Sequence, residues 1–208
     1  MTVNLGEQQV GFDPHELGFP SIDACMAIVV VCPNGLYGYH TYGGETKTAW
    51  DERGPKFKDF ITTHGGNPAK ATRLYGVTHA TNKRGWGGGV RKQLWIAELR
   101  AYAGHLGTTC KISGYDLDDA VAGGFHKSTT SAYVRFNKAG EKCNVSVQSW
   151  DTVTYTKLSS ANNPWGNDIK SLQRTSVGMN LVAVSGDIYD PIVPTAALRQ
   201  ISKSKLYS

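Results

Sequence analysis

The chain has 208 residues, of which 40% are apolar and 19% are charged, and its formal net charge is +5 at neutral pH. These values are typical of a globular protein, and the length suits one domain, residues 1–208, that buries a full core. No apolar run approaches the ~20 residues of a membrane-spanning helix. The N-terminal segment lacks the basic and apolar regions of an ordinary secretory signal, so none is expected. The scattered cations allow an acidic partner, but no motif indicates nucleic-acid binding.

The first 20 residues are expected to form an irregular lead-in, because Asp13 and Phe19 each precede a proline and therefore disfavour helix. Residues 25–41 are expected to form a β-hairpin around the turn signal Pro33-Asn34-Gly35. Its first arm, residues 26–31, is apolar at every position, which predicts a strand buried on both faces.

Residues 55–64 are predicted to form a short helix that begins at Pro55, and residues 90–105 have the clearest helical pattern in the chain. The segment 71–81 favours a strand, and 84–89 is expected to be a loop. Further strand patterns cover 109–113, 130–136, 144–157 and 181–184, and a short helix is expected at 195–201. Together they predict an α+β fold with sandwich-like mixed or antiparallel sheets flanked by a few helices.

The four cysteines are Cys25, Cys32, Cys110 and Cys143, and no Cys-x-x-Cys spacing indicates structural zinc. Most of them are expected to be buried free thiols, with Cys32 in or next to the turn. No metal or cofactor is expected.

Cys25 and His40 stand at the outer ends of the predicted hairpin, and a nucleophilic thiol needs a base about 3 Å away. A two-residue Asn34-Gly35 turn would place His40 opposite Val29, with Cys25 roughly 13 Å away. A four-residue loop over residues 31–34 would instead place Cys25 directly opposite His40. The residues alone leave both registers open, and they also allow Cys25 and His40 to be ordinary core and edge residues.

This hairpin resembles the catalytic segment of the cytotoxic necrotizing factor toxins and of the chemoreceptor glutamine deamidases. The match consists of Cys25, the apolar residues 28–30, Asn34-Gly35, Tyr37, and His40-Thr41 followed by Gly43. The resemblance covers about 25 residues, and it implies that Cys25 is the nucleophile and His40 the base.

Some members of that family orient the histidine with a threonine six residues before the cysteine. Phe19 occupies this position here, so Ser21, Asp23 or a main-chain carbonyl is expected to serve as the third element. The glycine that often precedes the cysteine in the toxins is absent here, because Ile22-Asp23-Ala24 stands at those places.

The resemblance implies a cysteine-dependent protein-glutamine deamidase, or a transglutaminase if an amine replaces water. The expected partner is a protein that presents a glutamine, such as a Rho-type GTPase. The expected biological role is that of a toxin or secreted effector that acts in the cytosol of a target cell.

Two other readings remain open at this point. A papain-like hydrolase would combine Cys25 with a distant histidine such as His105 or His126, but its cysteine should begin a helix. A non-enzymatic binding module would use aromatic side chains near loops, namely Trp50, Trp86 and Trp165.

Overall fold

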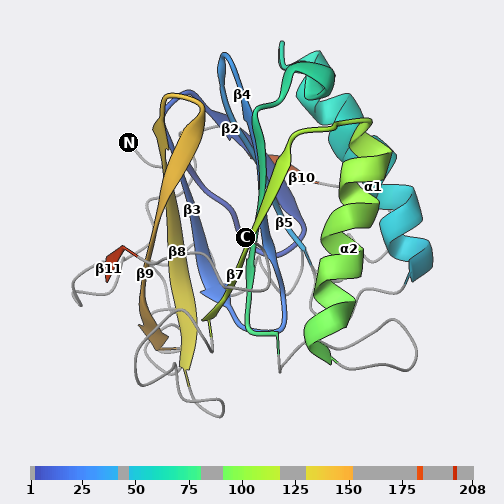
Figure 1. Cartoon of the computed structure of the whole chain (residues 1–208). Helices are drawn as coiled ribbons and strands as arrows, with labels where there is room; N and C mark the ends of the chain where they lie inside the picture. Colours follow the sequence, from blue (N-terminus) through green and yellow to red (C-terminus); the bar gives the residue numbers. More distant parts are fainter. Residues whose placement is uncertain are drawn as a thin grey trace.

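The computed structural model describes residues 3–41, 47–80, 91–117, 130–151, 182–184 and 199–200. These residues form three layers: a five-stranded sheet, a six-stranded sheet and a layer that contains the helices α1 and α2 (Figure 1). Both sheets contain parallel and antiparallel pairs. The predicted α+β class with sandwich-like sheets is therefore confirmed.

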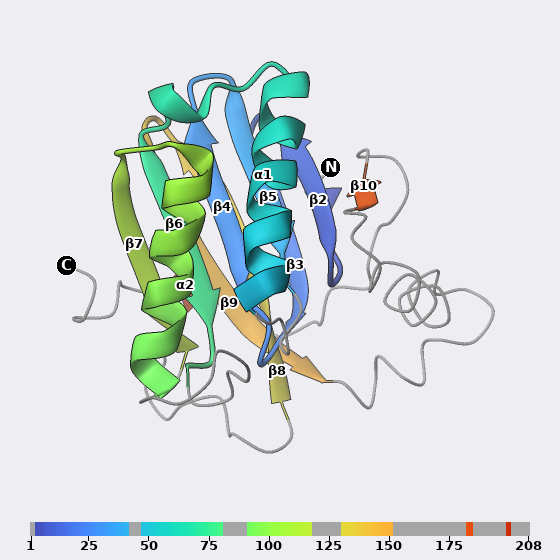
Figure 2. The same cartoon turned by 90° about the vertical axis from the view of Figure 1, so that its right-hand side faces the viewer.

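The six-stranded sheet is the middle layer. Its order is β10 (Val182–Val184), β2 (Gln9–Asp13), β5 (Gly35–His40), β4 (Ala27–Cys32), β6 (Arg73–Thr78) and β7 (Lys111–Asp116). Strands β6 and β7 are parallel, so their connection must cross over the sheet, and it contains α2 (Arg91–Leu106). Figure 2 shows α1 (Lys47–Thr63) and α2 side by side on the outer face of this sheet.

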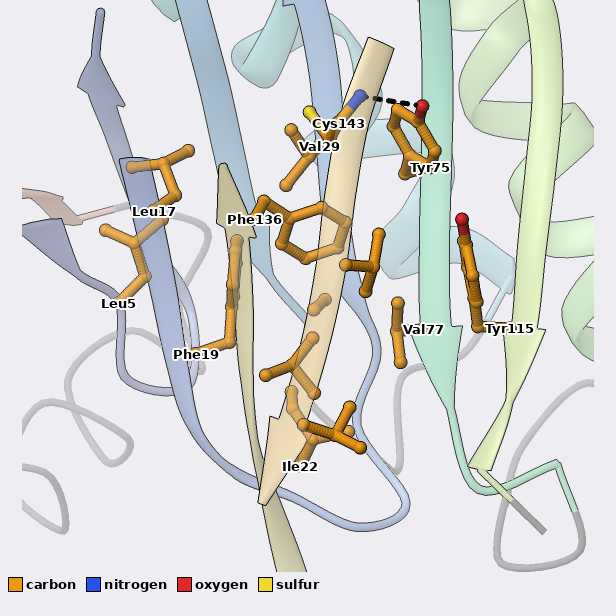
Figure 3. Close-up of a cluster of buried hydrophobic side chains, with 14 of the residues drawn as sticks. Leu5, Leu17, Phe19, Ile22, Val29, Tyr75, Val77, Tyr115, Phe136 and Cys143 are labelled. Carbon is orange, nitrogen blue, oxygen red and sulfur yellow. Dashed lines mark hydrogen bonds between the residues drawn. The ribbon is translucent and has the colours of Figure 1, made fainter. Parts of the chain in front are cut away.

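The five-stranded sheet packs against the other face of the middle layer. Its order is β1 (Val3–Asn4), β3 (Glu16–Ile22), β8 (Thr130–Ala139), β9 (Lys142–Asp151) and β11 (Arg199–Gln200). The inner cluster of apolar side chains lies between the two sheets, where the rings of Phe19 and Phe136 pack edge to face with their centroids 5.5 Å apart (Figure 3). A second cluster lies between the middle sheet and the helices.

Strand β4 contributes to both clusters. Ala27, Val29 and Val31 point to the inner cluster, whereas the alternate residues of β4 point to the helices. All six residues of β4 are buried, as the unbroken apolar run predicted. Cys32, the last residue of β4, lies next to the turn as expected, and it is buried.

The expectation of an irregular lead-in is wrong, because the first 22 residues contain three strands. Pro14 lies at the turn between β2 and β3, where Asp13 Oδ1 accepts hydrogen bonds from the main-chain N–H groups of His15 and Glu16. Pro20 falls where the β3–β8 register shifts, between Phe19 and Ile22. Both prolines therefore occupy positions where no ladder hydrogen bond is required of them.

Two helix predictions also need correction. Helix α1 begins eight residues before Pro55, so this proline lies inside the helix. Trp50 and Phe57, which lie on either side of Pro55, are fully buried, and this burial outweighs the proline's preference for a helix start. At the other end of the chain, Arg199–Gln200 pair with β9 as strand β11, where a terminal helix was expected.

The remaining predicted elements are present with shifted ends. The expected segments are matched by helix α2 and by strands β6, β7, β8, β9 and β10. A 3₁₀ turn at Pro68–Lys70 precedes β6. Helix α2 ends before Gly107, whose φ of 66° suits a glycine, whereas Gly104 lies within the helix. The loop expected at 84–89 lies outside the described residues. Within the described ranges, no helix combines the length and apolar content that crossing a membrane requires.

Gly38 on β5 marks a close approach of the two sheets. A Cβ atom at this position would lie 2.6 Å from Leu5 Cδ1 and 2.9 Å from Phe19 Cζ. We expect Gly38→Ala to lower the free energy of unfolding by about 1–3 kcal/mol, because the core must shift to accept the methyl group. The matched control is Gly104→Ala in α2, where a Cβ meets nothing within 4 Å and helix propensity should raise stability by up to about 1 kcal/mol. Urea denaturation measures both changes, and equal effects would contradict the packing argument.

Candidate active site

The register of the β4–β5 hairpin differs from both registers considered from the sequence. Cys32 faces Gly35 and Ala27 faces His40, so the two-residue loop consists of Pro33 and Asn34. Gly35 belongs to the ladder, and a side chain there would meet β2, because a Cβ at Gly35 would lie 2.7 Å from Phe12 Cε2. The observed register falls between the two expected ones, and it places Cys25 two positions beyond the residue that faces His40.

Cys25 nevertheless remains attached to the end of this ladder. The Thr41 N–H donates to the Met26 carbonyl at 2.9 Å, and the Met26 N–H donates to Thr41 Oγ1 at 2.9 Å. This pair continues the β4–β5 register by one step, so Cys25 and His40 are diagonal neighbours. Diagonal neighbours in a sheet are about 7–8 Å apart, a separation that aromatic side chains can span.

The thiol and the imidazole also share a face of the sheet. Cys25 belongs to the inner cluster between the sheets, together with Ala27. His40 pairs with Ala27 and therefore points to the same side, where its ring lies 6.0 Å from that of Phe19. The hairpin thus brings the two residues that the sequence singled out to one end of the interior.

The hydrogen bonding of His40 defines its tautomer. Its Nδ1 lies 2.7 Å from the main-chain oxygen of Leu5, and a carbonyl oxygen can only accept. Nδ1 therefore carries the proton and Nε2 carries the lone pair. Nε2 is buried and has no hydrogen-bond partner in the described structure. This is the form of an imidazole that can accept a proton.

Burial also sets the charge of His40. Its side chain is 1% exposed, and burial lowers its pKa from the ordinary 6.5 to about 4, against the smaller opposing effect of the Leu5 hydrogen bond. His40 is therefore neutral at neutral pH. A resting ion pair between His40 and Cys25 is therefore disfavoured, and His40 is suited instead to take a proton during the reaction.

A main-chain group holds the His40 ring. The Leu5 carbonyl orients His40, and one of the alternatives weighed from the sequence was a carbonyl in this role. Ser21 lies on β3, but its side chain is outside the described part of the structure, so its proposed role stays a prediction. Sequence reasoning did not identify Leu5, because a main-chain acceptor carries no signature in residue type.

The main chain around Cys25 is held on both sides. Thr78 Oγ1 on β6 donates to the Cys25 carbonyl at 2.7 Å, and Thr41 engages the Met26 N–H on the β5 side. The Met26 N–H is therefore occupied and does not serve as an oxyanion donor in this arrangement. The Cys25 side chain is 4% exposed, whereas Ala24 is half-buried and Asp23 is exposed.

Burial also affects the other three thiols. Burial raises the pKa of Cys32 and of Cys110, and it raises the pKa of Cys143 to about 12. Cys143 lies between the sheets, and its main-chain N–H donates to the Tyr75 hydroxyl (Figure 3). Thiols that stay protonated at neutral pH are poor nucleophiles.

The residues of the alternative readings lie elsewhere. His105 is in the helix layer, where its Nε2 lies 3.2 Å from Asp51 Oδ1, and Cys25 precedes a strand instead of a helix. Trp50 is fully buried against Tyr102, which leaves it no surface for a partner. His126, Trp86 and Trp165 lie outside the described residues. Among the residues that are described, no group of three or more His, Cys, Asp or Glu side chains could hold a metal ion.

Comparison with known proteins provides no relatives. No family model matches the chain, and no curated protein matches it. The geometry of the residues is therefore the basis for any functional assignment.

Burial of His40 predicts a pH dependence of stability. The unfolded chain takes up this proton near pH 6.5 and the folded chain only near pH 4, so folding loses stability as the pH falls through this interval. The loss should reach about 2 kcal/mol at pH 5 and about 3 kcal/mol near pH 4. Urea denaturation at several pH values should show a smaller loss for His40→Gln than for the wild type.

The matched control for this experiment is His15→Gln, which removes an exposed imidazole from the turn between β2 and β3. It should keep the wild-type slope of stability against pH. An identical slope in His40→Gln and the wild type would show that His40 is not the residue responsible.

Proposed function

We propose that this protein is a cysteine-dependent glutamine deamidase in which Cys25 is the nucleophile and His40 the general base. One observation carries the proposal: His40 is buried and neutral, the Leu5 carbonyl fixes its tautomer, and its Nε2 lone pair lies on the face that also holds the thiol. A core histidine needs no such arrangement, because a buried polar atom without a partner costs about 1–3 kcal/mol.

In the first half of the reaction, His40 Nε2 takes the thiol proton while Cys25 Sγ attacks the carboxamide carbon of a glutamine side chain. The tetrahedral intermediate collapses to a thioester, and His40 returns the proton to the departing ammonia. In the second half, His40 takes a proton from water, and the hydroxide formed attacks the thioester. The products are glutamate and the restored thiol, so the net reaction consumes one water and releases one ammonia.

The position of the thiol favours a side-chain substrate. Cys25 is covered, and the nearest exposed residue is Asp23, two positions away along the chain. A slender side-chain carboxamide can reach such a thiol by insertion, whereas hydrolysis of a peptide bond would require a length of main chain to lie across it. This difference favours deamidation over the papain-like alternative.

The nature of the substrate follows from the resemblance of the hairpin to the toxin and chemoreceptor deamidases. We propose a protein substrate with an exposed glutamine, of which a Rho-type GTPase is the first example to test. The same thioester would transfer the acyl group to an amine in place of water, so transglutamination belongs to the proposal. The corresponding role is that of an effector that acts in the cytosol of a target cell.

The test is peptide mass spectrometry of a purified Rho-type GTPase after incubation with the protein. Deamidation should raise the mass of one glutamine-containing peptide by about one dalton, and Cys25→Ser and His40→Gln should each lower the rate at least about 100-fold. Adding a primary amine should produce a second product if the site also transfers acyl groups.

Cys110→Ser is the matched control, because Cys110 is a partly exposed thiol at the start of β7, away from His40, and its loss should leave the rate unchanged. Each variant is checked by its unfolding temperature. Wild-type activity in a folded Cys25→Ser or His40→Gln protein would exclude the assignment of that residue.

A further inference from the structure

A second buried histidine lies next to the segment that carries Cys25. His79 follows β6 directly and is 1% exposed. Its main-chain N–H donates to the Asp23 carbonyl at 3.3 Å, and the preceding Thr78 donates through Oγ1 to the Cys25 carbonyl at 2.7 Å. Two hydrogen bonds therefore tie residues 78 and 79 to residues 23–25.

The chain beyond the ends of β4 and β6 keeps His79 close to the segment that carries the thiol. The antiparallel β4–β6 ladder ends at the pair Ala27–Val77, and beyond it the hydrogen bonds to the Cys25 and Asp23 carbonyls hold the two segments together. Val77 and Tyr75 belong to the inner cluster, and alternation along the strand predicts the same side for His79. Cys25 thus lies near two buried histidines, of which His40 is the last residue of β5 and His79 directly follows β6.

A neutral His40 cannot by itself stabilise a Cys25 thiolate, and His79 could supply this stabilisation. A neutral imidazole accepts a proton but supplies no positive charge, and a thiolate in an apolar interior needs a cation or an N–H donor beside it. We propose that His79 is a second site residue whose ring N–H stabilises the Cys25 thiolate while His40 handles the proton. This inference deepens the proposed function and rests on Cys25 being its nucleophile.

Other ionisable groups surround His79 in the described structure. Asp116 on β7 accepts a hydrogen bond from the Ala80 N–H at 3.2 Å and belongs to the helix side of the sheet, because it pairs with Thr78. The groups that face His79 on the inner side or approach it through the main chain are Asp23, Cys25, His40 and Tyr115. Of these, only the histidines can become cationic, so His79 is the candidate for a favourable charge.

The experiment measures the alkylation rate of Cys25 by iodoacetamide as a function of pH, resolved by peptide mass spectrometry. His79→Phe keeps the bulk of the ring without its N–H, and it should raise the midpoint of the Cys25 profile by about one pH unit. His79→Asn, which restores an N–H donor, should recover part of the shift. Cys110 in the same digest is the internal control, and its profile should be the same in all proteins.

An unchanged Cys25 midpoint in a folded His79→Phe protein would overturn the role of His79. If neither variant folds, the wild-type protein provides the test: capping Cys25 with a methylthio group should shift the ring proton resonances of His79, because it changes the group that the ring N–H faces. Ring resonances that capping leaves unmoved would refute the proposal.

These outcomes are separate from those of the deamidation assay, because alkylation needs no substrate. A shifted midpoint without any deamidated protein would retain His79 and reject the glutamine substrate. Deamidation with an unshifted Cys25 midpoint would retain the glutamine substrate and reject the role of His79.

Discussion

The burial of β4 on both faces is the constraint on which the rest of the structure depends. A strand without a polar face can be stable only inside three layers, and this one lies between a second sheet and a pair of helices. The strand is central, so both of its ends carry neighbours on either side. The residues just before β4 are accordingly held by the ends of β5 and β6, and this is where the candidate nucleophile lies.

His40 illustrates how the same burial produces chemistry. In water its imidazole would be partly protonated near pH 6.5, and between the sheets it stays neutral down to about pH 4. The interior therefore supplies a base without a resting charge. This neutral base supplies no positive charge to stabilise a thiolate. The proposed role of His79 is to stabilise the thiolate through its ring N–H instead.

Much of the fold could be predicted from the sequence, and the candidate site only in part. The apolar run before Pro33 identified β4, and the spacing of Leu94, Ala97 and Ala101 indicated α2. The register of the hairpin could not be predicted, because the turn signal at Pro33-Asn34-Gly35 fits several loop lengths and β5 is also paired with β2 on its other side. The start of α1 was missed for a similar reason, since the burial of Trp50 against α2 is a tertiary effect that a local proline rule cannot anticipate.

The Leu5 carbonyl has a practical consequence for the design of shortened chains. This acceptor lies next to β1, a strand of only two residues that pairs in parallel with β3. A chain that lacks residues 1–5 would keep nearly all of the apolar core and both helices. It would nevertheless lack the one group that prevents the His40 ring from exchanging its proton between the two nitrogens. Such a protein could fold well and still present the wrong nitrogen to a thiol, so good expression of a shortened chain is no guide to whether its site is intact.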